Sequence, residues 1–340
     1  MRAIRAIKDT AKIVFGAAAF GMTGKTPPTA YQSMISLFSL TGGRSNDAMA
    51  KLVGATQPMQ HIDAPAGVLG DLKMADVERI ANELREHGYK IFSAQLSAET
   101  VDRLMEFALT RPCLPRAKDA DESSSINTAT TYPRSAPRAI VYDFSPALLV
   151  NHPEVQKLMV DPSIVAVAQA YVGASPVLDE VNMWWTTNGS RKADSAAAQL
   201  YHFDMDRIRW LKVFIYLTDV TDDHGPHSFV VGSHRTGAIP DALLKKGYAR
   251  LTDTEINEAF GAGRTRSFTG PKGTIILEDT RGLHKGTPAL VGDRLMFEME
   301  FSSSMFGATP PLSGKINTYH SEEARNWIST RQRMYRRWLG

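Results

Sequence analysis

The sequence predicts an α+β fold in which a helical front half leads into an antiparallel β-sandwich or barrel. Up to about Gly173, apolar residues recur at the three- and four-residue spacing of amphipathic helices. From Pro176 onward, short apolar runs separated by turn residues are typical of strands. The chain has 340 residues, of which 43% are hydrophobic, so it can bury the core of one elaborated domain with extensions.

Residues 1 to 70 mix glycine, proline, threonine and serine with short apolar groups, and we expect an irregular extension with one or two helices. A helix at its start would be amphipathic, with cations on one side and apolar residues on the other. The cations are Arg2, Arg5, Lys8 and Lys12, and the apolar residues are Ile4, Ile7, Ala11 and Val14. Such a helix could touch an anionic membrane surface or a partner, or form a solvated charged face. No apolar run approaches the ~18 residues of a transmembrane helix.

Residues 71 to 305 are expected to form the main domain, which begins with helices and one short strand. The predicted elements are a helix from about Asp71 that ends at Gly88, a strand over 89–92, a helix that Ser97 caps and Pro112 closes, and helices that start near Pro153 and at Pro162. Residues 111 to 137 are rich in polar residues and proline and form a candidate lid loop. The strands predicted after them cover 177–187, 199–203, 211–220, 229–231, 266–268, 273–278 and 294–302.

A His-x-Asp motif, His202-Phe203-Asp204, lies on one of these predicted strands. Residues two apart on a strand project from the same side, so His202 and Asp204 can reach one metal ion. His284 supplies a second imidazole from a later segment. Two histidines and one carboxylate form a facial triad, which holds Fe(II) and leaves positions open for reactants. Asp206 could replace Asp204 only if the segment were helical.

A lone His-x-Asp motif is common by chance, and a surface histidine bonded to a nearby acid is its usual explanation. Here the distal His284 is followed, ten residues later, by Arg294. The complete set of two histidines, one carboxylate and an arginine therefore favours a metal site in an oxygenase.

Several segments of the second half, taken together, are similar to a known family. They are His202-Phe203-Asp204, the stretch from Gly225 to Arg235, His284-Lys285-Gly286 and Arg294. This set resembles the phytanoyl-CoA dioxygenase family of Fe(II)/2-oxoglutarate-dependent oxygenases over roughly residues 70 to 305. The resemblance implies a double-stranded β-helix, which is a jelly-roll or cupin-like core with helices packed on one side.

By this resemblance, His202, Asp204 and His284 bind iron, and Arg294 holds the far carboxylate of 2-oxoglutarate. A guanidinium suits that role because its planar fork matches a carboxylate. The implied reaction uses O2 to convert 2-oxoglutarate to succinate and carbon dioxide while a small-molecule or lipid-linked substrate is hydroxylated. Related halogenases have a small residue in place of the carboxylate, so Asp204 favours hydroxylation over halogenation.

Three further residues are candidates for contact with the cosubstrate. Lys212 and Tyr216 share one face of a predicted strand and would contact the cosubstrate or the substrate if that face looks into the barrel. Thr287 departs from the family pattern, because many relatives place a hydroxyl where Gly286 stands here. A local histidine cluster is interpreted as a structural loop near the pocket rather than a second metal site; its members are His224, His227 and His234.

Composition limits the partners and the location of the protein. A net charge of +3 is too small to indicate nucleic-acid binding. The single cysteine, Cys113, excludes an internal disulfide and fits a reducing, cytoplasmic compartment. Residues 306 to 340 form a basic C-terminal extension that, like the start of the chain, could contact a membrane peripherally. Two other classes of function stay open: a cupin-like metal protein with a different activity, and a non-catalytic member that binds membranes or partners.

Overall fold

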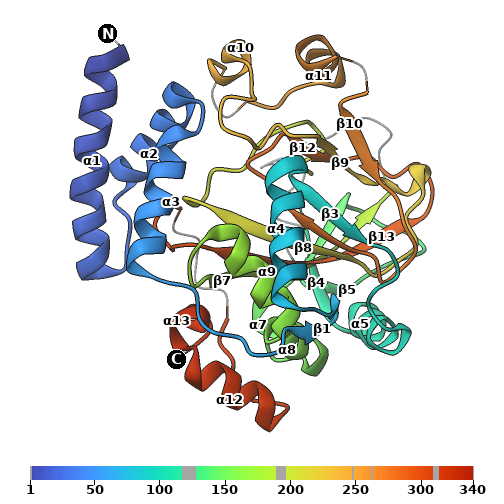
Figure 1. The fold of residues 1–340 in the computed structure, drawn as a ribbon. Helices are drawn as coiled ribbons and strands as arrows, with labels where there is room; N and C mark the ends of the chain where they lie inside the picture. Colours follow the sequence, from blue (N-terminus) through green and yellow to red (C-terminus); the bar gives the residue numbers. More distant parts are fainter. Residues whose placement is uncertain are drawn as a thin grey trace.

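The core of the protein consists of two antiparallel β-sheets (Figure 1). The computed structural model describes residues 2–116, 128–188, 197–246, 249–261, 263–308 and 314–339. The strands of the large sheet are β3 (Tyr89–Phe92), β4 (Pro112–Pro115), β5 (Thr130–Thr131), β6 (Val141–Phe144), β7 (Val177–Thr187), β8 (Trp210–Tyr216), β11 (Ile275–Glu278) and β13 (Asp293–Ser302). Those of the small sheet are β9 (His227–Val230), β10 (Thr265–Phe268) and β12 (His284–Gly286). A separate ribbon pairs β1 (Ala66–Gly67) with β2 (Gly70–Asp71).

The order of the strands confirms the expected double-stranded β-helix. The large sheet has the order β3-β11-β8-β13-β7-β6-β4-β5 and the small sheet β10-β9-β12. After β7, a bridge between His202 and His284 adds the segment that carries His202 and Asp204, here called the ligand segment, to the small sheet. The chain then returns to the large sheet as β8. It then passes through β9 and β10 in the small sheet, β11 in the large, β12 in the small and β13 in the large. This alternation between two sheets is the winding of a jelly roll.

Strand β13 shows how the pleat separates the two faces of the large sheet. Its odd-numbered residues from Leu295 to Phe301 belong to the main hydrophobic core. Arg294, Met296 and Glu298 instead line a cavity that residues of β9 and β12 line from the other side. Because successive side chains of a strand point to opposite faces, one strand serves both the core and the site.

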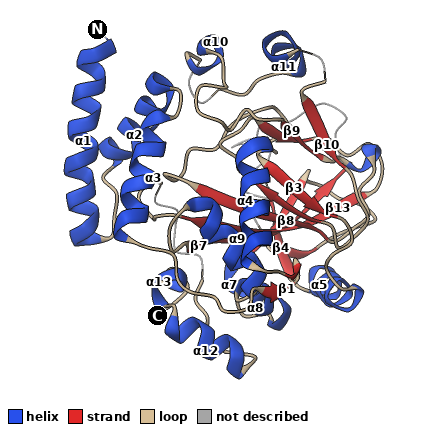
Figure 2. Cartoon of the chain, in the orientation of Figure 1, coloured by secondary structure: helices blue, strands red, loops and turns tan. Residues whose placement is uncertain are grey.

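Helices pack on the apolar face of the large sheet (Figure 2). They are α4 (Met74–His87), α5 (Ala98–Thr110), α7 (Pro146–Leu149), α8 (Pro153–Met159) and α9 (Pro162–Val172). Ser97 caps α5 as predicted, since its hydroxyl accepts from the Thr100 N–H. Gly88 ends α4 with a φ of 90°, and a Cβ there would lie 2.6 Å from the ring of Phe229. Only glycine fits that position, and it lets α4 pass directly into β3.

Shorter helical segments lie in the loops of the second half of the chain (Figure 1). They are η1 (Asp222–His224), α10 (Asp241–Leu244) and α11 (Asp253–Phe260). Leu243, Leu244 and Ile256 from α10 and α11 pack in a small apolar cluster with Tyr201 and Phe203. The apolar side of the ligand segment is therefore buried by these loops.

The start of the chain is more regular than the sequence predicts. Instead of an irregular extension with one or two helices, it forms three, namely α1 (Arg2–Thr23), α2 (Pro28–Thr41) and α3 (Arg44–Thr56). The Tyr31 hydroxyl donates to Asp206 Oδ1 over 3.3 Å, and Asn46 Nδ2 donates to the Ile208 carbonyl over 3.1 Å. Gly42 and Gly43 lie between α2 and α3 with positive φ, whereas Gly16, Gly21 and Gly54 lie within helices. Within the described residues, no helix is both long and apolar enough to cross a membrane.

The C-terminal stretch packs onto the domain. It contains α12 (Glu322–Thr330) and α13 (Gln332–Tyr335). The Tyr335 hydroxyl donates to the Met159 carbonyl over 2.8 Å, and Trp338 Nε1 donates to the Leu178 carbonyl over 2.9 Å. Both aromatic rings are buried, so the basic stretch that contains them is fixed to α8 and β7.

Two predicted segments near the cavity differ from the structure. The segment over 199–203 makes only isolated bridges, from Tyr201 to Leu251 and from His202 to His284. Within 111–137, β4 and β5 pair at the edge of the large sheet. Residues 117–127 lie outside the described residues, and with them the middle of the candidate lid loop.

Candidate metal centre

The local packing of the ligand segment turns two side chains toward the cavity. Phe203 packs on Phe38, with ring centroids 5.5 Å apart, and is buried. On either side of it, His202 and Asp204 line the cavity. The alternation predicted for an extended segment is therefore present, although the segment is not part of a continuous ladder.

Backbone pairing brings the second histidine next to the first. The His202 N–H donates to the His284 carbonyl over 3.0 Å, and the His284 N–H donates to the His202 carbonyl over 2.8 Å. The two ring centroids lie 4.3 Å apart. In addition, the Asp204 N–H donates to the Thr280 carbonyl over 2.8 Å, which ties the ligand segment to the turn before β12.

His202, Asp204 and His284 form a cluster that could hold one metal ion. One ligand atom from each lies within 4.8 Å of the other two, and all three residues are buried. The Nε2 atoms of both histidines lie 3.7 Å from carboxylate oxygens of Asp204. Two imidazoles and one carboxylate in this arrangement are the donor set of a facial triad.

Hydrogen bonds at the far side of each ring set the histidine tautomers. His202 Nδ1 lies 3.0 Å from the Leu200 carbonyl oxygen, and His284 Nδ1 lies 2.9 Å from that of Gly282. A carbonyl oxygen can only accept, so Nδ1 carries the proton in each ring and Nε2 keeps a free lone pair toward Asp204. Both rings are thus prepared to bind a cation through Nε2.

Metal binding is expected to be nearly independent of pH between about 5.5 and 8. Burial lowers the pKa of His202 to about 3 and that of His284 to about 4, so both rings stay neutral throughout this range. Two histidines with an ordinary pKa near 6.5 would bind protons as the pH falls toward about 5.5. Each would then lower the affinity of the site for the metal by about tenfold. Titration of the metal-free protein with Co(II) by calorimetry at both ends of the range tests this. A drop of about a hundredfold toward the acidic end would contradict it.

Lys212 lies beside the carboxylate of the cluster rather than free in the cavity. Its Nζ is 3.4 Å from Asp204 Oδ2, 3.0 Å from Glu298 Oε1 and 3.6 Å from Glu300 Oε2. Burial alone would raise the pKa of Asp204, but the positive charge of Lys212 is the largest effect that holds it below its usual value. The same neighbouring carboxylates outweigh burial at Lys212 and raise its pKa. Asp204 is therefore ionised and ready to bind a cation.

Arg294 is buried in the wall of the same cavity with unused hydrogen-bond donors. Its Nη2 donates to Thr186 Oγ1 at a long 3.4 Å. Its Nε and Nη1 are buried and find no hydrogen-bond partner in the described part of the chain. A Cβ on Gly286 would lie 3.5 Å from Nη2, so Arg294 reaches the strand that carries His284. Burial lowers the pKa of this guanidinium, and a carboxylate bound there would satisfy both the charge and the donors.

The cavity that contains these residues has a volume of about 380 Å³. His227 also lines the cavity, whereas the sequence predicted a structural loop near the pocket without a role for this histidine. Its ring centroid lies 5.5 Å from that of His284, and its Nε2 lies 2.9 Å from Glu278. Burial lowers the pKa of His227 to about 3. The pairing of β9 with β12 places His227 beside His284, and the sequence of the loop does not predict that pairing.

The remaining candidates lie outside the lining of the cavity. The Tyr216 hydroxyl donates to the Phe268 carbonyl over 2.8 Å and accepts from the His227 N–H over 3.1 Å. Thr287 Oγ1 lies 3.2 Å from Ser228 Oγ. Asp206, the rival carboxylate, accepts from Tyr31, and burial followed by the charge of Asp204 raises its pKa to about 6. In the described structure, these hydroxyls and this carboxylate are hydrogen-bonded to neighbouring groups of the protein.

Comparison with known proteins gives one family and several distant structures. The family model described as phytanoyl-CoA dioxygenase matches residues 84–290. No curated protein matches the sequence. Among solved structures, HygX from Streptomyces hygroscopicus with nickel and 2-oxoglutarate bound is 16% identical, with 72% of this chain and 93% of that chain covered and a TM-score of 0.48. EctD from S. alaskensis in its apoform is 19% identical, with 76% and 86% covered and a TM-score of 0.47.

Proposed function

Because the chain belongs to the phytanoyl-CoA dioxygenase family, we propose that it is an Fe(II)/2-oxoglutarate-dependent hydroxylase that acts on a small or lipid-linked molecule. Family membership confirms the resemblance read from the sequence, and with it the oxygenase class and its iron and 2-oxoglutarate cofactors. We propose the type of reaction, the class of substrate and the role of each residue.

One observation carries the proposal: a facial-triad donor set and a buried arginine with unused donors line the same cavity. The donor set fits iron, because His202 and His284 offer neutral nitrogens and Asp204 offers a charged oxygen. Arg294 fits the distal carboxylate of 2-oxoglutarate, because its buried N–H groups need an acceptor. A metal protein with an unrelated activity would not require that arginine.

Four residues of the cavity and Lys212 beside them would have separate roles in the proposed reaction. His202, Asp204 and His284 would hold the iron as its protein ligands. Arg294 would orient 2-oxoglutarate, and Lys212 would keep Asp204 ionised and fixed in place. When bound, iron and 2-oxoglutarate supply the oxidation of a substrate by O2, with succinate and carbon dioxide as co-products.

The substrate is proposed to enter the remaining part of the cavity. That part is lined by both apolar and polar side chains, including Phe144, Trp184 and Asn182. The volume of about 380 Å³ suits a small molecule or the reactive end of a longer one. We place the enzyme in a reducing, cytoplasmic setting, which agrees with its one buried free thiol, Cys113.

Succinate formation with Fe(II), 2-oxoglutarate and O2 across a panel of small metabolites tests the proposal. We expect one class of compound to stimulate turnover and to gain one oxygen atom, which mass spectrometry detects. If the iron-loaded protein never converts 2-oxoglutarate, the proposed oxygenase activity is rejected. If turnover is stimulated but the product gains no oxygen, the hydroxylation part of the proposal fails.

Arg294→Lys is expected to raise KM for 2-oxoglutarate by roughly 10- to 100-fold. Lysine keeps the charge but cannot reproduce the two parallel hydrogen bonds of a guanidinium with a carboxylate. Steady-state succinate formation at varied 2-oxoglutarate gives KM, and calorimetry shows whether metal affinity stays unchanged. Arg79→Lys, a matched change on the exposed surface of α4, should leave both unaltered. An unchanged KM in the Arg294 variant would remove Arg294 from the cosubstrate site.

A further inference from the structure

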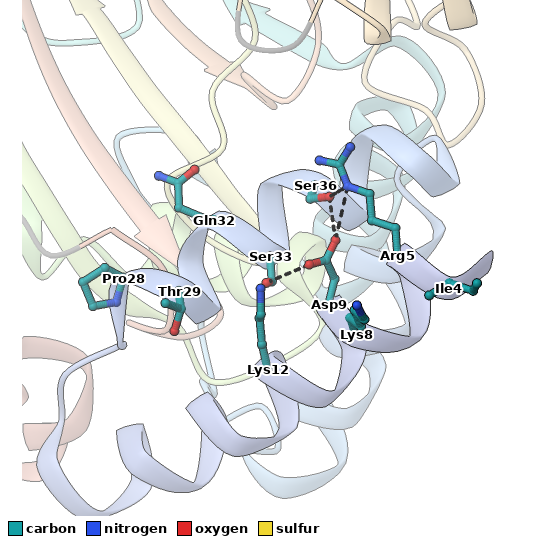
Figure 3. Close-up of a pocket in the computed structure, with 10 residues that line it drawn as sticks. All are labelled: Ile4, Arg5, Lys8, Asp9, Lys12, Pro28, Thr29, Gln32, Ser33 and Ser36. Carbon is teal, nitrogen blue, oxygen red and sulfur yellow. Dashed lines mark hydrogen bonds and ion pairs between the residues drawn. The ribbon is translucent and has the colours of Figure 1, made fainter. Parts of the chain in front are cut away.

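Helix α1 lies at the edge of the molecule, with α2 between it and the rest of the fold (Figure 1). Its packed side is formed by Asp9, Ile13 and Gly16, which are buried. Asp9 accepts hydrogen bonds from Ser33 over 3.0 Å and from Ser36 over 2.7 Å, both on α2 (Figure 3). The spacing of four and three residues places all three on one face of the helix, so the opposite face points away from the protein.

That opposite face is apolar and exposed. The large residues on it are exposed over between 61% (Ile4) and 82% (Met22) of their surface; they are Ile4, Ile7, Val14, Phe15 and Met22. Residues 4, 7, 11, 14, 15, 18 and 22 recur every three or four positions, which makes them one continuous stripe on a helix. Monomeric proteins rarely leave such a stripe in water, and a contiguous apolar patch usually marks a binding surface. We call these seven residues the α1 stripe.

Cations lie along one border of the α1 stripe. Arg5, Lys8 and Lys12 line a groove of about 670 Å³ between α1 and α2 (Figure 3). Arg5 contacts Asp9, whereas Lys8 and Lys12 form no ion pair within the described residues. Asp9 is the only acid of α1, and it is buried against α2. The exposed surface of the helix is therefore apolar along its centre and positive along its edge.

We propose that α1 binds an anionic lipid surface and lies flat in it, with the α1 stripe among the acyl chains and the lysines at the phosphates. The combination of an apolar face and a cationic border in a helix that cannot span the bilayer is the signature of an interfacial helix. A second copy of the chain fits less well. Two α1 helices placed stripe to stripe would leave their cations unpaired, because neither helix offers an exposed acid.

Flotation of the full-length protein with vesicles tests this proposal. We expect binding to vesicles of mixed phosphatidylglycerol and phosphatidylcholine, and much weaker binding to phosphatidylcholine alone. Phe15→Glu should lower the partition coefficient by about tenfold or more, and the double change Lys8→Glu, Lys12→Glu by about a hundredfold. Added salt should weaken the binding of the wild-type protein, because the phosphate contacts are screened.

Met74→Glu provides the matched control, since Met74 is an exposed apolar residue at the start of another helix, α4. This variant should bind vesicles like the wild type. Failure of the wild-type protein to bind anionic vesicles, or undiminished binding by Phe15→Glu, overturns the proposal. Light scattering after gel filtration checks the alternative: a dimer that Phe15→Glu converts to a monomer, without any vesicle binding, would assign the stripe to self-association.

Discussion

Replacing Asp204 with alanine is expected to abolish 2-oxoglutarate turnover and to weaken metal binding by more than about 100-fold. Loss of a residue that merely supports a ligand costs about 10- to 100-fold in many metal sites, and removal of the only carboxylate ligand should cost more. Of the three ligands in the described cluster, the change leaves the two neutral imidazoles and removes the negative charge that attracts a divalent cation. Calorimetric titration with Co(II) and a succinate assay with Fe(II) measure the two losses separately.

Asp206→Asn is the control that separates loss of a ligand from loss of nearby charge. Asp206 lies two residues along the same segment and is largely buried, but it hydrogen-bonds Tyr31 and is not part of the ligand cluster. We expect this variant to keep metal affinity and turnover. Lys212 still has Glu298 and Glu300 as partners when Asp204 is replaced. A folded Asp204→Ala protein that still turns over 2-oxoglutarate, or an Asp206→Asn protein that loses it equally, would contradict the assignment.

The candidate site could be predicted from sequence because its residues follow short spacings or the two-residue alternation of a strand. The spacing of His202 and Asp204 fixes their common side in any extended segment, and this holds even though the segment makes only isolated bridges. The same period of two explains why Trp184 lines the cavity while Trp185 stacks on Tyr132 in the core. Short-range signals such as the Ser97 cap and the Gly88 stop also appear where they were expected.

What the sequence could not predict depends on contacts between distant strands. His227 enters the cavity because β9 pairs with β12, and no feature of the Gly-Pro-His-Ser stretch indicates that pairing. Glu298 and Glu300 meet Lys212 because β13 lies beside β8. The alternation of side chains along a strand predicts which residues share a face, but it does not predict which strand lies beside it. The sequence alone therefore could not show whether Lys212 and Tyr216 contact the cosubstrate or support the fold.

Arg207, just beyond the ligand motif, illustrates a strong constraint that no motif reveals. It forms an ion pair with Asp179 of β7, and each side chain is exposed over only 1% of its surface. Its Nη2 donates to Asp179 Oδ1 over 2.9 Å, and its Nη1 donates to the Ala308 carbonyl over 2.6 Å. One side chain thus ties the end of the ligand segment to the large sheet and to the chain that follows β13.

Arg207→Met is expected to lower the free energy of unfolding by about 3–5 kcal/mol, because it leaves the Asp179 carboxylate buried without its main partner. Urea unfolding followed by tryptophan fluorescence measures the change. The double variant Asp179→Asn, Arg207→Met should be less destabilised than Arg207→Met alone, since no unpaired charge is then buried. Arg79→Ala breaks an exposed ion pair with Glu83 and should cost no more than about 1 kcal/mol. Equal losses in the buried and exposed variants would show that Arg207 is no more important to the fold than a surface cation.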